Sequence, residues 1–449
     1  MRIVARVMAL ERGEAEREAA VVLERFAERH QKLKWFLLKR FEELRDHLVG
    51  DQPLSEAQRQ LIGAYFTLEY SLEAAALFNP SMVPHPDQSG LPAGSLRFVL
   101  SLRATGEGHL SSIVFRTGIA DRDGQISINT PTRFVTAADL HPNPSYNKPL
   151  FERKLRELGV LSREAQRLMD QLGEQFTFEQ LTAVTGGTLP ETAEQLLAVA
   201  RANYEISFEP SDRYSERVIF PVAPAEARGI EDARFVRFCD DDGRLTYYAT
   251  YTAFDGYVTL PQLLETEDFV HFRISTLNGP EVQNKGMALF PRKLRGHYAM
   301  LGRQDGENIF LMHSDLLHFW YEKRLLLEPA YPWDFVQLGN CGSPIETSRG
   351  WLVLTHGVGA MRRYAIGAIL LDLDDPSRVI GRLPEPLLDP TPEEREGYVP
   401  NVVYSCGSLV HEGRLILPYA MSDQSTSFAT VPLDDLLAEL AAHPPASVP

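Results

Sequence analysis

Residues 343–358 read SPIETSRGWLVLTHGV, and this stretch decides the fold because an apolar strand, a glycine turn and a second strand ending in His follow one another. The same order recurs in ARFVRFCDDDGRLTYYATYTA (233–253), MALFPRKLRGHYAMLGR (287–303) and GSLVHEGRLILPYAMSD (407–423). Successive copies lie roughly 50 to 65 residues apart, about the length of one β-propeller blade. Residues 79–115 would supply a fifth copy. The repeat predicts an all-β core built as a five-bladed β-propeller, with a β-sandwich or two unrelated sheets as the alternative.

Helical patterns precede, interrupt and follow the strands. Between Glu11 and Leu48 apolar residues recur at three- and four-residue spacing, which predicts one long amphipathic helix. Ser55 begins a second helical stretch, which Asn79 and Pro80 end. The predicted parts are an N-terminal helical hairpin (1–76), a propeller (77–432) with a helical insertion (about 149–202), and a C-terminal helical tail (433–449).

The first predicted helix has an apolar stripe that needs a partner surface. Its members are Phe26, Leu33, Leu37 and Leu44. Exposed stripes of this size mark interfaces on soluble proteins. We therefore expect a homo-oligomer that assembles through the helical elements.

Composition and charge exclude several classes of protein. The 449 residues contain 45 Lys and Arg against 61 Asp and Glu, and the net charge of -16 repels nucleic acid. Cys239, Cys341 and Cys406 lie far apart without metal-ligand spacing, which favours a reducing compartment. The N-terminal residues are charged, and no apolar run approaches the roughly 20 residues that span a bilayer. We expect a cytoplasmic protein without a membrane anchor.

Motifs of common enzyme classes are absent from the sequence. It contains no P-loop, no GxGxxG, no HExxH and no GxSxG. His313 and His318 are five residues apart, which is the wrong spacing for two ligands on one helical face. Cys341 with His356 could form a nucleophile and a base, but a small buried cysteine is the favoured interpretation.

Acidic and basic residues gather where GIEDARF (229–235) meets an apolar strand. Asp232 and Arg234 are two residues apart and would face one side of an extended chain. They could form a surface ion pair. Their position between apolar runs and after a glycine indicates instead a crowded pocket, in which a carboxyl can stay protonated.

Cations and a few polar partners occupy matching places in other copies of the repeat, namely Arg103, Lys285, Arg303, His356, Arg362, Arg363 and Tyr364. Arg suits bidentate contact with phosphate oxygens. Each arginine could simply pair with a neighbouring carboxylate. As a group in an acidic chain, they predict a bound anion the size of phosphate.

Five segments resemble, in the same order, the signature segments of glycoside hydrolase family 130, the mannoside phosphorylases and related mannosidases. They are GIEDARF (229–235), NKGMALFPRKLRGHYAMLGR (284–303), GSPIETSRGWLVLTHGVG (342–359), YAIGAILLDLDDPSRVIGRLPEPLL (364–388) and YVPNVVYSCGSLVHEGRLILPYAMSD (398–423). The resemblance implies a five-bladed propeller with an axial active site. It also implies inverting phosphorolysis of β-mannosides, of the manno-oligosaccharide or mannosyl-glucose type, to mannose 1-phosphate.

The resemblance also implies roles for individual residues. Asp232 would be the catalytic acid and would protonate the glycosidic oxygen through a sugar hydroxyl. The implied phosphate pocket contains Asn79, Ser81, Arg103, Lys285, Arg303, His356 and Tyr364. Asp423 would contact the sugar in the donor subsite. The expected substrate-binding set is Glu231, Arg234, Asn284, Glu346, Asn401 and Asp423.

Two positions depart from the family pattern and leave alternatives open. Glu346 stands where phosphorylases more often have Lys, and Gly302 replaces the usual His before Arg303. A carboxylate near the phosphate pocket could act as a base on water, which would make the protein a β-mannosidase. A catalytically inactive glycan-binding propeller is the non-enzymatic alternative. We expect inorganic phosphate as co-substrate and no metal or other cofactor, while linkage, acceptor sugar and oligomeric state stay open.

Overall fold

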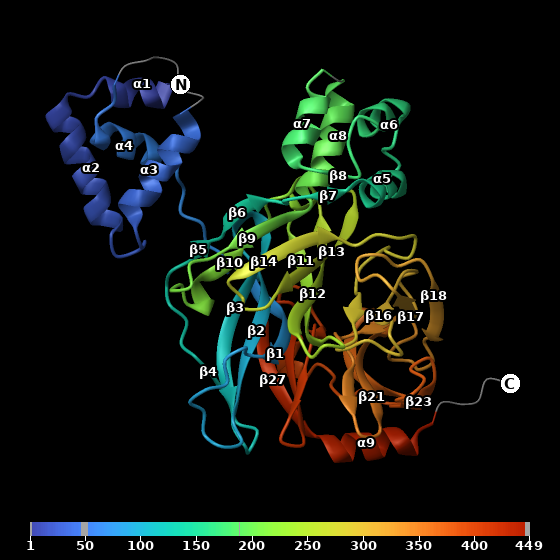
Figure 1. Cartoon of the computed structure of the whole chain (residues 1–449). Helices are drawn as coiled ribbons and strands as arrows, with labels where there is room; N and C mark the ends of the chain where they lie inside the picture. The colour runs from blue at the N-terminus through green and yellow to red at the C-terminus, as the bar shows by residue number, and fades with distance from the viewer. Residues whose placement is uncertain (1, 46–52, 188, 445–449) are drawn as a thin grey trace. The chain divides into compact units, whose positions relative to one another are not determined.

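The computed structural model describes residues 2–45, 53–187 and 189–444, which divide into two compact units (Figure 1). Unit 1 contains Met1–Ser71 and Thr132–Val135, and unit 2 contains Leu72–Pro131 and Thr136–Pro449. The units meet in sequence five residues before the predicted boundary at 76. Leu72–Ala75 belong with the sheets because the Ala75 amide donates to the Thr105 carbonyl at 2.9 Å.

Unit 1 is helical, but its helices differ from the predicted hairpin. The described residues form α1 (Arg2–Met8), α2 (Arg12–Phe26), α3 (Leu33–Leu44) and α4 (Glu56–Tyr65). The expected single helix over 11–48 is therefore wrong: it breaks at Ala27–Lys32, and its last residues, 46–48, lie outside the described residues. The break lets α2 and α3 both pack against α4, so that Leu37 and Phe41 are buried within the unit.

The predicted start of the second helix is confirmed, whereas its end is wrong. The Ser55 hydroxyl accepts from the Gln58 amide at 3.2 Å, and the Gln58 side chain accepts from the Ser55 amide at 3.0 Å. This capping box fixes the start of α4. The helix ends at Tyr65, and residues 76–84 form a strand because pairing with the next strand buries Phe78 and Met82.

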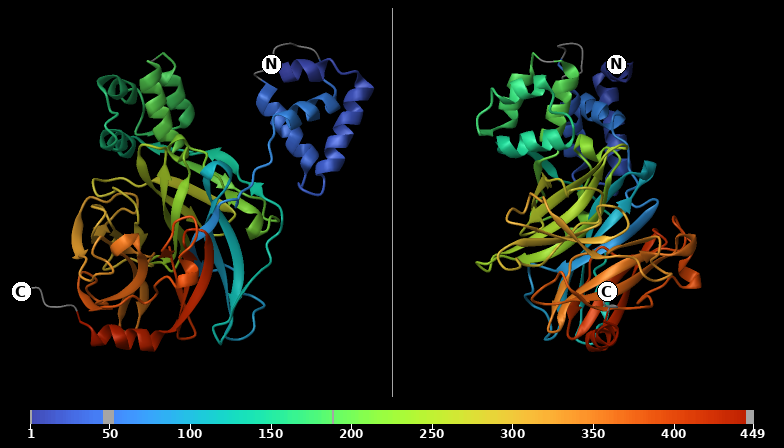
Figure 2. Two further views of the ribbon diagram at one scale, coloured as in Figure 1. Left: turned by 180° about the vertical axis from the view of Figure 1, so that it is seen from behind. Right: turned by 90° about the vertical axis from the view of Figure 1, so that its right-hand side faces the viewer.

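Unit 2 contains five larger sheets, which form the five blades of the predicted propeller (Figures 1 and 2). Blade 1 has β1 (Ala76–Pro84), β2 (Leu96–Thr105), β3 (Ser111–Ala120), β10 (Arg217–Ile219) and β5 (Thr136–Ala137), with β4 (Ile126–Ile128) beside β3. Blade 2 has β11 (Ile230–Cys239), β12 (Leu245–Phe254), β13 (Thr259–Thr266), β14 (His271–Thr276), β9 (Tyr204–Ser207) and β6 (Asp139–Pro142). Blade 3 has β15 (Ala288–Leu289), β16 (Tyr298–Gly302), β17 (Ile309–Ser314) and β18 (Lys323–Leu327).

The last two blades complete the set. Blade 4 has β19 (Gln337–Asn340), β21 (Gly350–Val358), β22 (Tyr364–Leu371) and β23 (Val379–Arg382), with β20 (Ile345–Thr347) paired to β21. Blade 5 has β24 (Val403–Tyr404), β26 (Arg414–Met421) and β25 (Leu409–His411), with β27 (Ser425–Pro432) paired to β26. Blade 5 adjoins blade 1, because the Leu77 amide donates to the Gln424 carbonyl at 2.9 Å.

The glycine turns of the repeat connect the first two strands of each copy. Gly243, Gly296, Gly350 and Gly413 have φ values of 82°, 85°, 146° and 69°. This left-handed region favours glycine, so the repeated G at each turn is a backbone requirement. The predicted repeat is thus a real structural repeat, with the second strand of each hairpin running back across the blade.

A helical insertion extends from the outer edge of blade 2. It contains α5 (Lys148–Glu157), α6 (Arg163–Met169), α7 (Phe178–Thr185), α8 (Pro190–Arg201) and the ribbon of β7 (Tyr146–Asn147) and β8 (Gln175–Phe176). The insertion lies between β6 and β9, which pair with each other, and its helices bury a core of their own around Phe151, Leu155 and Phe176. Figure 2 shows these helices grouped at one side of the sheets.

The C-terminal helix α9 (Leu433–Ala442) covers blade 4 and blade 5. Its apolar residues Leu436, Leu437 and Leu440 join the core between these blades. Residues 445–449 of the predicted tail lie outside the described residues. Within the described ranges, no helix is long and apolar enough to cross a membrane.

Candidate active site

The candidate site lies where the second strand of several blade hairpins ends. Arg103 is near the end of β2, Arg303 directly follows β16, His356 is near the end of β21, and Asp423 follows β26. These ends are opposite the glycine turns, because each hairpin runs from its turn toward this end. The repeat therefore brings together four polar residues that are far apart in sequence.

A second set of site residues occupies left-handed backbone positions at the innermost strands. Their members, with φ values of 51°, 56°, 62° and 62°, are Asn79, Asp232, Asn284 and Asn401. Asn and Asp tolerate this conformation better than other non-glycine residues. In β11 the pairing with β12 shifts between Glu231 and Arg234. This bulge breaks the regular alternation of the strand, but Asp232 and Arg234 still line the same small pocket.

Asp232 is 8% exposed and is surrounded by donors and cations. The Asn79 amide Nδ2 donates to Asp232 Oδ1 at 2.5 Å, and Arg103 Nη1 lies 3.8 Å from the same oxygen. Burial raises the pKa of Asp232, but Lys285, Arg103 and Arg234 together with the Asn79 hydrogen bond outweigh it, so its pKa is lowered overall. The surrounding cations thus favour the carboxylate form of Asp232.

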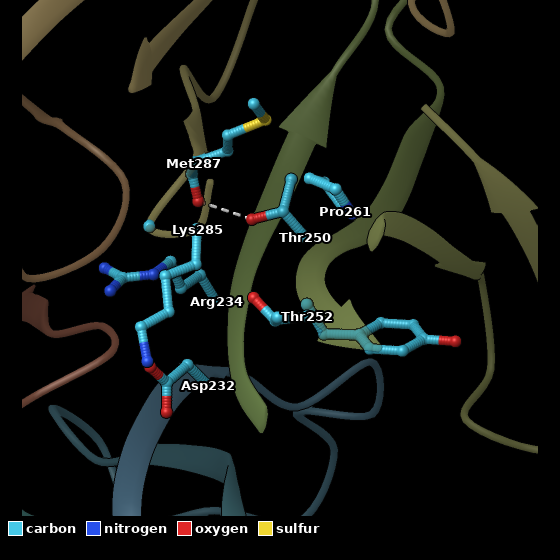
Figure 3. Close-up of a pocket in the computed structure, with 9 residues that line it drawn as sticks. Asp232, Arg234, Thr250, Thr252, Pro261, Lys285 and Met287 are labelled. Carbon is cyan, nitrogen blue, oxygen red and sulfur yellow. Dashed lines mark hydrogen bonds between the residues drawn. The ribbon is translucent and has the colours of Figure 1, made fainter. Parts of the chain in front are cut away.

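Glu231 joins two of the cations beside Asp232. Its Oε1 accepts from Arg103 Nη2 at 2.8 Å, and its Oε2 lies 3.6 Å from Lys285 Nζ. Figure 3 shows the Lys285 side chain extending toward Asp232, along a small pocket that Thr250 and Thr252 also line. Glu231 therefore orients Arg103 and Lys285 at the edge of the site.

Asp423 lies in a tight turn between β26 and β27, with φ of 50°. Burial, together with the charge of Asp232, raises the pKa of Asp423 to about 6 against the opposing charges of Arg103, Arg362 and Lys285. The two aspartates therefore have pKa values displaced in opposite directions. Such separation allows two neighbouring carboxyl groups to take different roles.

Arg303 and His356 form a buried pair without a carboxylate. Arg303 is 8% exposed, and its Nη1 lies 3.2 Å from His356 Nε2. His356 Nδ1 lies 3.2 Å from the Asn340 carbonyl, so Nδ1–H donates there and Nε2 accepts from Arg303. Burial, with the charge of Arg303, lowers the pKa of His356 well below its usual range. Among the described residues, no Asp or Glu side chain lies within ion-pair distance of Arg303.

Three residues support this pair from behind. Arg234 donates from Nη1 to Asn340 Oδ1 at 2.8 Å and from Nη2 to the Tyr404 hydroxyl at 2.6 Å. The Tyr404 ring lies 4.9 Å from the His356 ring, measured between centroids. The Tyr364 ring also stacks on His356, at 5.9 Å and 15° between planes, and its centroid lies 6.4 Å from that of the Tyr404 ring. These contacts fix the orientation of the imidazole.

A family model described as beta-1,4-mannooligosaccharide phosphorylase matches residues 194–441 of this chain. The chain belongs to glycoside hydrolase family 130. It is 35% identical over 251 residues to the 1,2-beta-oligomannan phosphorylase of Thermoanaerobacter sp. (strain X514), a match covering 53% of this chain and 80% of that protein. It is 30% identical over 230 residues to the beta-1,2-mannobiose phosphorylase of Listeria innocua, a match that covers 49% of this chain and 63% of that protein.

The fold agrees with a solved structure of the same family. The beta-1,2-mannobiose phosphorylase from Listeria innocua, in complex with beta-1,2-mannobiose, superposes with a TM-score of 0.50 and 22% identity. The match covers 82% of this chain and 93% of that chain. The predicted family and the propeller fold are thus confirmed.

Two of the residues implied by the family 130 pattern lie inside the protein. Ser81 is fully buried, and its hydroxyl accepts from the Phe235 amide at 3.0 Å. Its predicted contact with phosphate is therefore wrong, because Ser81 joins β1 to β11. Arg234 is also buried, and it donates to protein groups, so we assign it to support of the site and not to direct contact with substrate.

Glu346 does not belong to the site. Its carboxylate forms two hydrogen bonds with Arg292, at 2.7 and 2.8 Å, and its side chain is 41% exposed. In β20 it pairs with Trp351, five residues before His356 in β21. At roughly 3.3 Å per residue, this places it about 17 Å from the histidine along the strand. The predicted contact with substrate and the predicted base on water are both wrong, since Glu346 lies near the glycine-turn end of the hairpin.

The other departure from the family pattern, Gly302, has a local explanation. A Cβ at this position would lie 2.6 Å from the Gln304 amide nitrogen. The Gln304 side chain donates to the Glu281 carbonyl at 3.0 Å. Gln304 thus occupies space that a side chain at position 302 would need.

Asn284 and Asn401 each form a hydrogen bond with the backbone of another site residue. The Asn284 side chain donates from Nδ2 to the Arg303 carbonyl at 3.2 Å, which joins the segment before β15 to the arginine. The Asn401 carbonyl accepts from the Tyr364 amide at 3.0 Å. Their contact with substrate stays a prediction.

The remaining candidate nucleophiles and ligands do not form further centres. Cys341 Sγ lies 4.0 Å from His356 Nδ1, but burial raises the pKa of the thiol to about 12. The structure therefore favours the small buried cysteine over a nucleophile. Across the described ranges, no three His, Cys, Asp or Glu side chains are grouped as metal ligands.

Sequence reasoning missed Asn340 and Tyr404, which hold Arg234 and His356. Tyr404 lies within the family 130 segment 398–423, and Asn340 lies just before the segment 342–359, but neither residue is charged. A signal was present, since Asn340 is a polar residue in an innermost strand, as Asn79 and Asp232 are in theirs.

Proposed function

We propose that this chain catalyses inverting phosphorolysis of β-mannosides and releases mannose 1-phosphate. The observation that carries the proposal is Arg303, a buried arginine without a carboxylate partner among the described residues. A buried charge without a counter-ion is costly, and an anion beside it removes that cost. Phosphate, with oxygens that match a guanidinium, is the anion that this reaction requires.

In this mechanism the acid and the nucleophile approach from opposite sides of the anomeric carbon. Asp232 donates the proton that reaches the glycosidic oxygen, through a sugar hydroxyl. Arg303, Lys285 and Arg103 hold phosphate for attack, and neutral His356 keeps Arg303 oriented. A single displacement of this kind inverts the anomeric configuration.

The lowered pKa of Asp232 fits this mechanism once phosphate is considered. The cations that lower it, Lys285 and Arg103, are those proposed to bind phosphate. Bound phosphate offsets their charge, so the pKa of Asp232 rises and the carboxyl takes up a proton. Calorimetric titration of phosphate in buffers of different ionisation enthalpy should show proton uptake, which Asp232→Asn should abolish. Equal proton uptake by both proteins would contradict this coupling.

The substrate proposed first is a β-1,2-linked manno-oligosaccharide, because the two relatives described above are named for β-1,2-linked mannans. A panel of mannobioses of different linkage and mannosyl-glucose, each incubated with phosphate, tests the proposal. Formation of mannose 1-phosphate from one member supports it. Formation from no member, with sugar binding intact, would favour the non-catalytic glycan-binding propeller.

The structure offers no support for hydrolysis by Glu346 as the main activity. The residue expected to activate water, Glu346, is paired with Arg292 outside the site. The carboxylates in the site, Asp232, Glu231 and Asp423, lie among cations that suit phosphate. We therefore place phosphorolysis ahead of the β-mannosidase alternative.

We also propose that the reaction needs no metal or other cofactor. Arg and Lys can support phosphate attack without a Lewis acid. Excess chelator should leave the rate of mannose 1-phosphate formation unchanged. A loss of rate that a divalent ion restores would contradict this assignment.

The compartment and the assembly are further proposals. Cys239, Cys341 and Cys406 are free thiols, which fits a reducing cytoplasm. For assembly, the predicted stripe is not available, because Leu37 is buried and Leu44 packs against the core of unit 1. We propose instead that Trp35 (58% exposed) and Phe36 of α3 contact a second copy of the chain. Replacing both by Ser should lower the mass measured by light scattering. An unchanged mass would contradict an interface at α3.

A further inference from the structure

One loop connects the helical insertion to the candidate site. Residues 277–286, called the 277–286 loop below, join the end of β14 to β15 and carry Asn284 and Lys285. Lys285 is the half-exposed cation of the site, and its Nζ lies 3.6 Å from Glu231 Oε2. The position of its ammonium group depends on how the loop is held.

Helix α5 of the insertion binds the first residues of this loop through two charged side chains. Lys154 Nζ donates to the Leu277 carbonyl at 2.7 Å, and Glu157 Oε1 accepts from the Gly279 amide at 2.8 Å. Lys154 and Glu157 also contact each other, with Nζ 3.2 Å from Oε2. Together they satisfy a donor and an acceptor of the loop backbone.

This contact is more specific than ordinary packing. Lys154 is 4% exposed, and burial lowers its pKa. Apolar residues of similar size would stabilise a buried contact at least as well, so a buried ion pair specifies geometry more than it adds stability. The loop is equally constrained at Gly279, where φ is 114° and a Cβ would lie 1.9 Å from the Trp320 carbonyl oxygen. The start of the loop is therefore held by side-chain contacts from α5 and by close backbone packing at Gly279.

Hydrogen bonds carry this constraint along the loop to the site. The Val282 amide donates to the Gly279 carbonyl at 3.0 Å, which closes a turn. The Gln304 side chain then holds the Glu281 carbonyl, and Asn284 holds the Arg303 carbonyl. The loop is thus fixed by α5 at its start and by the neighbours of Arg303 at its end.

We propose that Lys154 and Glu157 are positioning residues, through which the helical insertion holds the 277–286 loop so that Lys285 faces the phosphate beside Arg303. This inference rests on the proposed function. It assigns the insertion a role in phosphate binding, although its own residues do not line the site.

The matched control is Lys148, on the same helix. Its Nζ also donates to a backbone carbonyl, that of Leu172 at 3.1 Å, but Leu172 belongs to the insertion itself. We expect Lys154→Met to raise the KM for phosphate about tenfold, within the roughly 100-fold that a 1 Å misplacement can cost. The KM for the mannoside should stay nearly constant, and Lys148→Met should change neither constant. A uniform loss of kcat in both variants would overturn the inference.

A double-mutant cycle separates positioning of Lys285 from general damage. On a Lys285→Met background, Lys154→Met should change the KM for phosphate by less than about twofold, because its effect acts through the missing ammonium group. Effects that multiply independently would overturn the inference. Glu157→Gln, which preserves side-chain size, should shift the same constant in the same direction by a smaller factor if Lys154→Met does not fold.

A measurement without turnover distinguishes this inference from the proposed function. Hydrogen–deuterium exchange of residues 277–286 should be faster in Lys154→Met than in the wild type and in Lys148→Met. Unchanged exchange in the loop overturns the inference even if the wild type makes mannose 1-phosphate. Faster exchange, with no mannose 1-phosphate from the wild type, supports the positioning of the loop by Lys154 and rejects the proposed function.

Discussion

Arg292 and Arg303 lie at opposite ends of one hairpin in blade 3 and have opposite surroundings. Arg292 is 40% exposed on its side chain and binds Glu346 through two hydrogen bonds. Arg303 is buried, contacts neutral His356 and has no carboxylate partner in the described part of the chain. An exposed pair contributes little, whereas a buried unpaired charge needs an anion. The same residue type is therefore paired with a carboxylate at the glycine-turn end and left without one at the site end, where we propose that it binds phosphate.

The largest expected effect comes from the aspartate at the site end of β11. Asp232→Asn keeps the shape and removes the transferable proton, so we expect kcat to fall at least about 100-fold with mannoside binding largely intact. Asp240, at the other end of β11, pairs with Lys293. Asp240→Asn should leave kcat unchanged. Equal losses in both variants, measured by steady-state kinetics, would remove the distinction between the two ends.

The next effect compares the two arginines directly. Arg303→Ala removes a charge-assisted contact, so we expect the KM for phosphate to rise about 10- to 100-fold, with the KM for the mannoside nearly constant. Arg292→Ala removes only a partner of Glu346 and should leave both constants unchanged. An equal rise of the KM for phosphate in the two variants would show that the arginines act only through the overall electrostatic field of the protein.

The smallest effect concerns Asp423, whose pKa is raised to about 6 by burial and by Asp232. Because the folded pKa is raised above that of the unfolded chain, its contribution to stability is complete below about pH 4 and is lost as pH rises through 6. Asp423→Asn should therefore have a Tm about 2–4 °C above the wild type at pH 8 and no such gain at pH 4. Asp374→Asn, at an exposed position, serves as the control for removal of one negative charge. A gain that is equal at both pH values would contradict the raised pKa.

Local sequence patterns predicted the repeated part of the fold well. A glycine turn needs a left-handed residue, and Gly243, Gly296, Gly350 and Gly413 provide it at the same place in each copy. Because each second strand begins at such a turn, the turns also indicated where these strands end. Arg103, Arg303, His356 and Asp423 lie at or near those ends.

Patterns that depend on tertiary context were interpreted less well. The second helix was predicted to continue to residue 78, but it ends at Tyr65, and residues 76–84 form strand β1 because pairing with β2 buries Phe78 and Met82. The bulge at Asp232 could not be read from an alternating strand pattern. Glu346 was assigned to the site from its place in the family 130 pattern alone. Its pairing with Trp351 in β21 was not visible in the sequence, and this pairing places Glu346 near the glycine turn.

The central claim is that the unpaired cation at Arg303 binds phosphate as the nucleophile. Phosphorus-31 NMR of the reaction with a β-1,2-linked manno-oligosaccharide, run with and without inorganic phosphate, tests it most directly. We predict that mannose 1-phosphate forms in a one-to-one ratio with the mannosidic bonds cleaved, and that cleavage stops without phosphate. Release of free mannose at the same rate without phosphate would contradict the claim.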